Sequence, residues 1–244
     1  MNEANVTGIK SNERVKKFGE VFTPDNIVCD MLKLVEDAYA EENKNSDIDI
    51  IKRTYLEPAC GNGQFLIRLL WEKLSAIDRM TKNKCLTQED IDYYTILAVS
   101  GIYGVDIQED NVQESIERMK ELLYNGLVTS FVVDNKEVVI TNNVKVSEEA
   151  KPIINKILDK NIILGDMLDT SDNAARCIEY EFNPDRTVKI TSCVLNDPTE
   201  MSNSEIGTYN YKDLVSALDD SNTSNEMDGF DFWANINIGW VNES

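Results

Sequence analysis

Residues 55–66 read YLEPACGNGQFL, and this stretch decides the fold. Residues 53–57 are typical of a short strand, and residues 63–80 have the apolar spacing of an amphipathic helix. Between them, Gly61 and Gly63 allow a sharp turn and let the backbone approach a ligand without a Cβ in the way. The helix also offers free N–H groups in its first turn. The pattern predicts a strand, a glycine turn and a helix that together form either a ligand cradle or an ordinary connecting turn.

Helices and strands alternate through most of the chain. We predict helices over residues 22–42, 63–80, 87–99, 109–126 and 147–160. We predict strands over residues 53–57, 101–106 and 161–166, and a hairpin over residues 131–141. Thr23 is the expected cap of the first helix, and Pro24 suits its first turn. The alternation predicts an α/β fold with a mostly parallel sheet, in which ligands bind at the carboxyl ends of the strands.

The sequence changes character after Asp166. Residues 169–228 are rich in Asn, Asp, Ser and Thr, and we expect an acidic polar insertion there. Within it, residues 188–195 fit a strand, residues 211–220 a short helix and residues 219–229 a mobile loop. The predicted organisation is a polar lead-in, an α/β domain, this insertion and a final strand with the C-terminus. The corresponding residues are 1–20, 21–168, 169–228 and 229–244.

Composition limits the chemistry. The 244 residues contain no histidine, which excludes Ser-His and Cys-His catalysis and histidine-based metal sites. The five cysteines form no C-x-x-C pair, so we expect small buried thiols and no metal. No apolar run is long enough to span a membrane and the N-terminus has no signal-peptide pattern, so a cytoplasmic location is expected.

The net charge is -20, and residues 161–244 hold 16 Asp and Glu against 4 Lys and Arg. Such a surface repels phosphate backbones. The charge therefore argues against nucleic-acid binding by this chain alone.

Acidic residues follow two of the predicted strands. Asp106 ends the strand about one βαβ unit after the glycine turn, where a carboxylate can accept two hydrogen bonds from a ribose diol. Asp166 ends the next buried strand, where it can accept a hydrogen bond from an adenine amino group. A helix N-terminal acid and a turn residue are the structural alternatives. The turn lacks the third glycine of a dinucleotide fingerprint, because position 66 is Leu, and it has no P-loop lysine.

Four motifs in order resemble the class I S-adenosylmethionine-dependent methyltransferases, and more closely the N6-adenine DNA methyltransferases of bacterial and phage restriction–modification systems. They are KKFGEVFTP (residues 16–24), LEPACGNGQFL (residues 56–66), IYGVDI (residues 102–107) and IILGDML (residues 162–168). The resemblance covers about residues 14–168, with an insertion-like stretch near residues 127–150. It implies a Rossmann-like fold and S-adenosylmethionine as the cofactor.

The resemblance also implies a role for individual residues. Phe22, Thr23 and Pro24 would line the methionine end of the cofactor, and Glu57, Ala59, Gly61 and Gly63 would form the glycine loop. Asp106 would bind the ribose hydroxyls, Ile107 and Met167 would pack on or beside the adenine, and Asp166 would bind its amino group.

The family's catalytic motif, Asn/Asp-Pro-Pro-Tyr/Phe, is degenerate in this chain. In GFDFWANINIGW (residues 229–240), Asn235 stands at the catalytic position, and Ile236, Asn237 and Ile238 replace the prolines and the aromatic residue. Trp240 is a candidate stacking platform for a flipped base. The weaker match is LNDPTE (residues 195–200).

Three functions therefore stand. The first is a site-specific adenine-N6 DNA methyltransferase that needs a partner subunit for target recognition, because no stretch resembles a target-recognition domain. The second is a catalytically inactive S-adenosylmethionine-binding or interaction protein. The third is a protein-glutamine methyltransferase, which suits the acidic charge slightly better.

Overall fold

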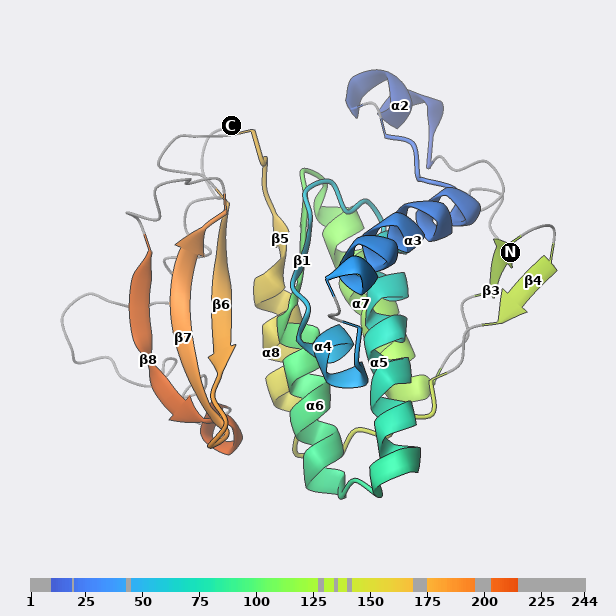
Figure 1. The fold of residues 1–244 in the computed structure, drawn as a ribbon. Helices are drawn as coiled ribbons and strands as arrows, with labels where there is room; N and C mark the ends of the chain where they lie inside the picture. Colours follow the sequence, from blue (N-terminus) through green and yellow to red (C-terminus); the bar gives the residue numbers. More distant parts are fainter. Residues whose placement is uncertain are drawn as a thin grey trace.

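The computed structural model describes residues 10–18, 20–42, 45–126, 130–133, 136–139, 142–168, 175–195 and 203–214 (Figure 1). The helices are α2 Asn12–Phe18, α3 Asp25–Glu41, α4 Asp47–Lys52, α5 Gln64–Lys84, α6 Gln88–Ser100, α7 Glu109–Asn125 and α8 Lys151–Asn161, with a 3-10 turn, η1, at Tyr211–Asp213. The strands are β1 Tyr55–Glu57, β2 Ile102–Asp106, β3 Ser130–Val133, β4 Lys136–Val139, β5 Ile162–Leu164, β6 Arg176–Phe182, β7 Thr187–Val194 and β8 Ser204–Asn210. Within the described ranges, no helix is long and apolar enough to cross a membrane.

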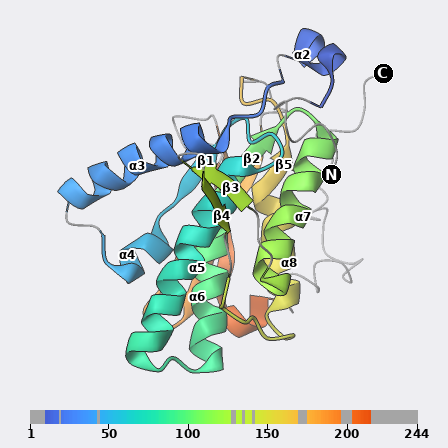
Figure 2. The ribbon, with the colours of Figure 1, turned by 90° about the vertical axis from the view of Figure 1, so that its right-hand side faces the viewer.

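A parallel sheet lies at the centre of the fold, as predicted. Its strands follow the order β1-β2-β5 (Figure 2). The register pairs Leu56 with Tyr103 and Val105 with Ile163, so the three carboxyl ends lie at one edge. Each new strand is added on the same side of the previous one, as in one half of a doubly wound sheet. The α/β class is confirmed, and the arrangement is compatible with a Rossmann-like fold.

Helices bury the central strand completely. All five residues of β2 are buried, and α5 and α7 both pack against it, side by side (Figure 1). Leu66 and Ile77 of α5, Met119 of α7 and Ile154 of α8 have no exposed side-chain surface. The burial of these apolar side chains holds the sheet and fixes where its carboxyl edge lies.

Local capping signals set several helix ends where the sequence predicts them. Thr87 and Asp90 form a reciprocal capping box at the start of α6. Gly126 ends α7 with a left-handed φ of 61°. The same type of box, between Ser46 and Asp49, begins α4, a short helix that the sequence analysis did not predict.

Three predicted helices start or extend differently in the structure. Thr23 does not cap α3, because Pro24 is the N-cap residue and the helix end has no side-chain hydrogen bond. The helix expected over residues 147–160 begins at Lys151, after a turn. At the position of the short helix expected over residues 211–220, the described part shows one 3-10 turn, and residues 215–220 lie outside it.

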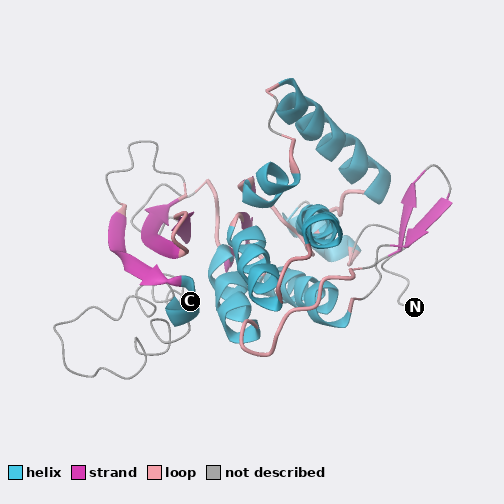
Figure 3. Ribbon diagram, turned by 60° about the horizontal axis from the view of Figure 1, so that its bottom comes forward, coloured by secondary structure: helices cyan, strands magenta, loops and turns pink. Residues whose placement is uncertain are grey.

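The segment predicted as a polar insertion, residues 169–228, contains a second sheet. Strands β6, β7 and β8 pair antiparallel in that order, and only β7 was predicted. The sheet packs against α6 and α8, Val188 and Ile190 are buried, and the hydroxyl of Tyr103 on β2 donates to the Ile178 carbonyl at 2.9 Å. Figure 3 shows it on one side of the helices, with the predicted β3–β4 hairpin on the opposite side.

Candidate functional site

The glycine turn between β1 and α5 has the sharply turned, left-handed backbone that only glycine adopts without strain. Gly61 and Gly63 have φ values of 54° and 83°, in the left-handed region. The Gly63 N–H donates to the Cys60 carbonyl, and the Cys60 N–H donates to the Val105 carbonyl, both at 2.9 Å. A Cβ on Gly63 would lie 2.9 Å from the Ser115 Oγ. Hydrogen bonds therefore connect the turn to the end of β2, and only glycine fits at position 63.

Asp106 connects the end of β2 to this turn. Its Oδ2 accepts the Gly61 N–H at 2.9 Å, and its Oδ1 accepts the Gln108 N–H at 2.9 Å and the Asn111 Nδ2 at 3.1 Å. The residue is 9% exposed. A carboxylate has about four lone-pair sites, so one site is left for a further donor. A ribose diol would have to share or replace at least one of these three bonds.

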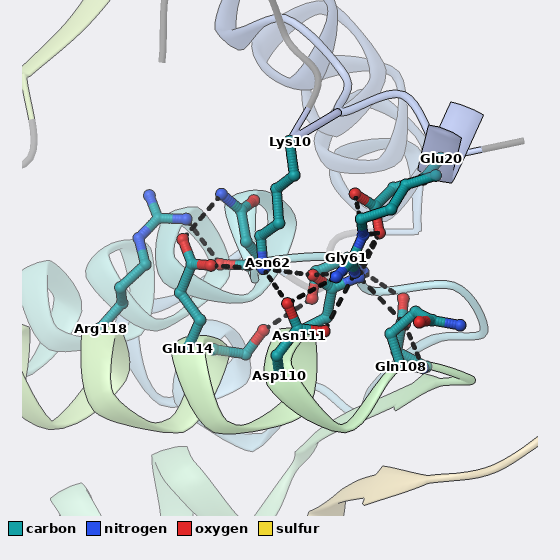
Figure 4. A network of polar contacts seen from close by, with 12 residues as sticks. Lys10, Glu20, Gly61, Asn62, Gln108, Asp110, Asn111, Glu114 and Arg118 are labelled. Atoms are coloured by element: carbon teal, nitrogen blue, oxygen red, sulfur yellow. Dashed lines mark hydrogen bonds and ion pairs between the residues drawn. The ribbon is translucent and has the colours of Figure 1, made fainter. Parts of the chain in front are cut away.

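The N-terminal segment lies over the glycine turn. The Phe22 ring faces Gly61, and a Cβ on that glycine would lie 3.2 Å from the ring. Lys10 Nζ reaches Asp110 at 3.0 Å and Glu114 at 2.8 Å, both on α7. These contacts bring residues about one hundred positions apart to one side of the turn (Figure 4).

A carboxylate from this N-terminal segment completes the network. Arg14 pairs with Glu20 and with Asp110, and Glu20 Oε2 accepts the Asn111 Nδ2 at 3.2 Å. Asn111 thus bridges Glu20 and Asp106, the acid at the end of β2. The hydrogen bond from Arg14 lowers the pKa of Asp110 to about 2, so this carboxylate stays ionised at neutral pH.

Burial changes the ionisation of two groups beside the turn. It raises the pKa of Glu57, which accepts the Ala59 N–H at 3.3 Å. Burial and the nearby Asp106 charge raise the pKa of Cys60 to about 12, so its thiol is neutral and a poor nucleophile. Cys177 is also buried, but Cys29 and Cys193 are half-buried and Cys85 is exposed, so the prediction of buried thiols is confirmed only for Cys60 and Cys177.

The end of β5 differs from the end of β2. The Gly165 N–H donates to the Asp106 carbonyl at 2.9 Å, so the two strand ends are neighbours. The Asp166 side chain is exposed, and its Oδ1 accepts the Leu168 N–H at 2.9 Å. Ile107, expected to pack on an adenine, is 51% exposed.

The structure therefore brings most of the predicted site residues to one edge. Gly61 lies between Phe22 and Asp106 and contacts both. Ile107 and Asp166 follow the neighbouring strands β2 and β5. Thr23 and Met167 are half-buried and Pro24 is exposed. Asn235 and Trp240 lie outside the described residues.

The residues that the sequence analysis missed make long-range contacts. Asn111 donates to Asp106 and also to Glu20, and Ser115 Oγ donates to the Gly61 carbonyl at 2.9 Å. Arg118 donates to the Asn62 carbonyl at 2.6 Å and to the Gln64 side chain. Glu20 stands in the FGEVFTP motif, but the three α7 residues recur one turn apart, at 111, 115 and 118, and that spacing is the signal that could have found them.

Two acceptors and one apolar side chain near this edge are available to a ligand. Asn62 Oδ1 is buried without a hydrogen-bond partner among the described residues, and would accept from a ligand. Asp166 is an accessible acceptor, and Ile107 offers apolar surface beside it. A separate cavity of about 380 Å³ lies elsewhere, lined by α6, the start of α8 and Tyr211. Among the residues placed by the structure, no group of three or more Cys, Asp or Glu could hold a metal.

Comparison with protein-family models, with curated proteins and with solved structures finds no match for this chain. The fold and the site together define the class: an α/β protein with a glycine turn and acidic residues at the carboxyl edge of a parallel sheet.

Proposed function

We propose that the chain binds S-adenosylmethionine at the carboxyl edge of β1, β2 and β5. The observation that carries the proposal is the bond between the Asp106 carboxylate and the Gly61 N–H, which joins the glycine turn to the acid of the next strand. Asp166 follows the third strand at the same edge. Ligands bind at this edge in parallel α/β sheets, because loops and free backbone groups converge there.

Each residue of the edge has a role in the proposed complex. Asp106 accepts the ribose hydroxyls, and Asp166 accepts the adenine amino group. Ile107 and Met167 contact the adenine ring. The methionine end lies toward Phe22, Thr23 and Pro24 and toward the loop that holds Glu57, Ala59, Gly61 and Gly63.

We further propose methyl transfer to the N6 of a flipped adenine in DNA, with a partner subunit that recognises the target. The Asn235 side chain would accept a hydrogen bond from the target amino group and aim the nitrogen lone pair at the reactive methyl group, which the cofactor supplies. A base leaves the duplex to reach such a site. The partner would contribute positive charge, because a chain with a net charge of -20 repels phosphates.

A second candidate is an S-adenosylmethionine-binding protein without transferase activity. The replacement of Pro-Pro-aromatic by Ile236, Asn237 and Ile238 favours it. Incubation with labelled cofactor and DNA, with and without candidate partner chains, distinguishes the two. Label in DNA that is lost in Asn235→Ala supports transfer, and binding without label supports the second candidate.

The test of the shared binding step is calorimetric titration of S-adenosylmethionine into the purified chain. We expect saturable binding that Asp106→Asn weakens at least tenfold, because the amide offers one acceptor where the carboxylate offers two. Asp78→Asn is the matched control, since Asp78 pairs with Lys82 on α5 and lies apart from the turn. Equal affinities of Asp106→Asn and wild type, with both folded by circular dichroism, would remove Asp106 from the site.

A further inference from the structure

Two cysteines face each other in the second sheet. Strands β6 and β7 pair antiparallel (Figure 1), and their register places Cys177 directly opposite Cys193. Side chains of directly opposite residues point to the same face of a sheet, where their Cβ atoms are about 4.5–5.5 Å apart. The other face carries Ile178 and Ile190, which are both buried. The two thiols are therefore neighbours on one face of the hairpin.

The spacing of the two cysteines fits a disulfide. The Leu195 N–H donates to the Ala175 carbonyl at 2.8 Å, so these two residues form a hydrogen-bonded pair. Such pairs recur at every second residue of an antiparallel ladder, so Cys177 and Cys193 form the next one. The Cα atoms of a hydrogen-bonded pair are about 5.5 Å apart, and disulfides join cysteines whose Cα atoms are about 4.4–6.8 Å apart. The bond can therefore form without a change of register.

The two thiols differ in their access to solvent. Cys177 is 5% exposed, whereas Cys193 is half-buried. The Cys193 thiol donates to Glu179 Oε2 at 3.6 Å, so a carboxylate is in place to take its proton. Burial raises the pKa of Cys177 to about 12, so this thiol stays protonated at neutral pH. Cys193 is therefore the thiol that a small oxidant reaches first, and Cys177 is the partner that resolves the oxidised product.

We propose that Cys177 and Cys193 are a redox-active pair, which a peroxide converts into a disulfide that clamps β6 to β7. In the first step, the Cys193 sulfur attacks hydrogen peroxide, the O–O bond breaks, and a sulfenic acid and one water form. In the second step, the Cys177 sulfur attacks the Cys193 sulfur. The hydroxyl group leaves with the Cys177 proton as a second water, and the S–S bond forms. The two thiols lose two electrons, and the peroxide gains them.

The strand pairing favours the second step and gives the bond a structural effect. Because the ladder holds the two sulfur atoms opposite each other, the second step is intramolecular and aligned. The bond would lie one residue from Ile178, whose carbonyl accepts the hydroxyl of Tyr103 on the central strand β2. A covalent link there closes the hairpin and opposes its unfolding. The inference rests on the register of β6 and β7, and it holds whether or not the chain binds S-adenosylmethionine.

Peptide mapping of the full chain after brief treatment with hydrogen peroxide tests the proposal. The treated chain is denatured, alkylated and cut with trypsin, which cleaves after Arg186 and Lys189 and so separates the two cysteines. We expect peptides 177–186 and 190–212 to be joined in most molecules and to separate on addition of dithiothreitol. The urea midpoint of the oxidised chain should fall when dithiothreitol is added. This comparison isolates the disulfide, because dithiothreitol does not reverse methionine oxidation.

Two variants distinguish the pair from general thiol reactivity. Cys193→Ser combined with Thr191→Cys keeps the number of cysteines and moves one thiol two positions along the same face. Its Cα is then about 7–8 Å from that of Cys177, too far for a disulfide, so the yield of joined peptides should fall at least tenfold. Cys85→Ser is the matched control, because it removes the exposed cysteine and leaves the pair intact. It should leave the yield unchanged, and circular dichroism confirms that each variant is folded.

Four results would overturn the proposal. The first is complete alkylation of Cys177 and Cys193 after a treatment that oxidises Cys85. The second is an equal yield of joined peptides in the variant with the relocated thiol. The third is joined peptides found only in disulfide-linked dimers, which would assign the bond to two chains. The fourth is a urea midpoint that dithiothreitol leaves unchanged in chains that contain the bond.

Discussion

Asp106 and Asp166 follow neighbouring strands of one sheet, yet their surroundings differ. Asp106 is buried and accepts three hydrogen bonds, from Gly61, Gln108 and Asn111. Asp166 is exposed and, among the described residues, accepts one, from Leu168 in its own loop. The β2 end is therefore organised by the protein itself, whereas the β5 end is open to a ligand. One acid should contribute to stability and to binding, the other mainly to binding.

The largest expected effect on stability is at the glycine turn, which is hydrogen-bonded to the end of β2. Gly63→Ala introduces a side chain at a φ of 83° and 2.9 Å from Ser115 Oγ. We expect a loss of about 2–4 kcal/mol in the free energy of unfolding, from left-handed strain and overpacking together. Urea denaturation measures it. Ser115→Gly in the same chain should recover only part of the overpacking, because the Ser115 Cα would still lie 3.1 Å from the new Cβ. A loss below about 0.5 kcal/mol for Gly63→Ala alone would show that the turn adapts freely.

Replacing the two acids tests the comparison directly. Asp106→Ala leaves three donors without their acceptor, so we expect a loss of about 2–4 kcal/mol in the free energy of unfolding. Asp166→Ala should change stability by less than about 0.5 kcal/mol, as at other exposed sites. Both should weaken S-adenosylmethionine binding under the proposed function. Equal stability losses in the two variants would remove the distinction between the two strand ends.

The smallest expected effect concerns the contact between the N-terminal segment and α7. The pKa of Asp110 is about 2 in the folded state, below its ordinary 3.8, with the hydrogen bond from Arg14 as the main cause. The pair therefore contributes stability above about pH 4 that is lost as the pH falls toward about 2. The gain is small, because Asp110 is half exposed.

Asp110→Asn checks this pH dependence. The difference in urea midpoint between wild type and Asp110→Asn should be largest near neutral pH and should shrink below about pH 4. A difference that stays constant across this range would mean that Asp110 stabilises the fold through contacts other than its charge.

Much of the fold around the site follows from local sequence signals. Helix caps such as Thr87 and Gly126, and the glycines of the turn, act within a few residues, so they set element boundaries directly. Strands β6 and β8 were missed because their polar outer faces resemble loop sequence, although both are neighbours of β7 in the chain and pair with it antiparallel. Helix α4 was missed although its Ser46–Asp49 box is a readable signal.

In the candidate site, too, some features follow from local sequence signals and others depend on long-range contacts. The positions of Gly61, Asp106 and Asp166 follow from strand ends in a parallel sheet, which the sequence pattern indicates. The bonds to the Asp106 carboxylate do not, because the Gly61 N–H reaches it from another element, and Asn111, which donates to it, also donates to Glu20 of the N-terminal segment. The role of Asn235 stays a prediction.

Backbone amide spectra of the isotopically labelled chain, recorded during addition of S-adenosylmethionine, test the central claim most directly. The account predicts saturable shifts at Gly61, Gly63, Ile107 and Gly165, at the carboxyl edge of the sheet. It predicts no shifts around Gln88 and Lys212, which line the separate cavity. An unchanged spectrum, or shifts confined to that cavity, would contradict the proposed cofactor site.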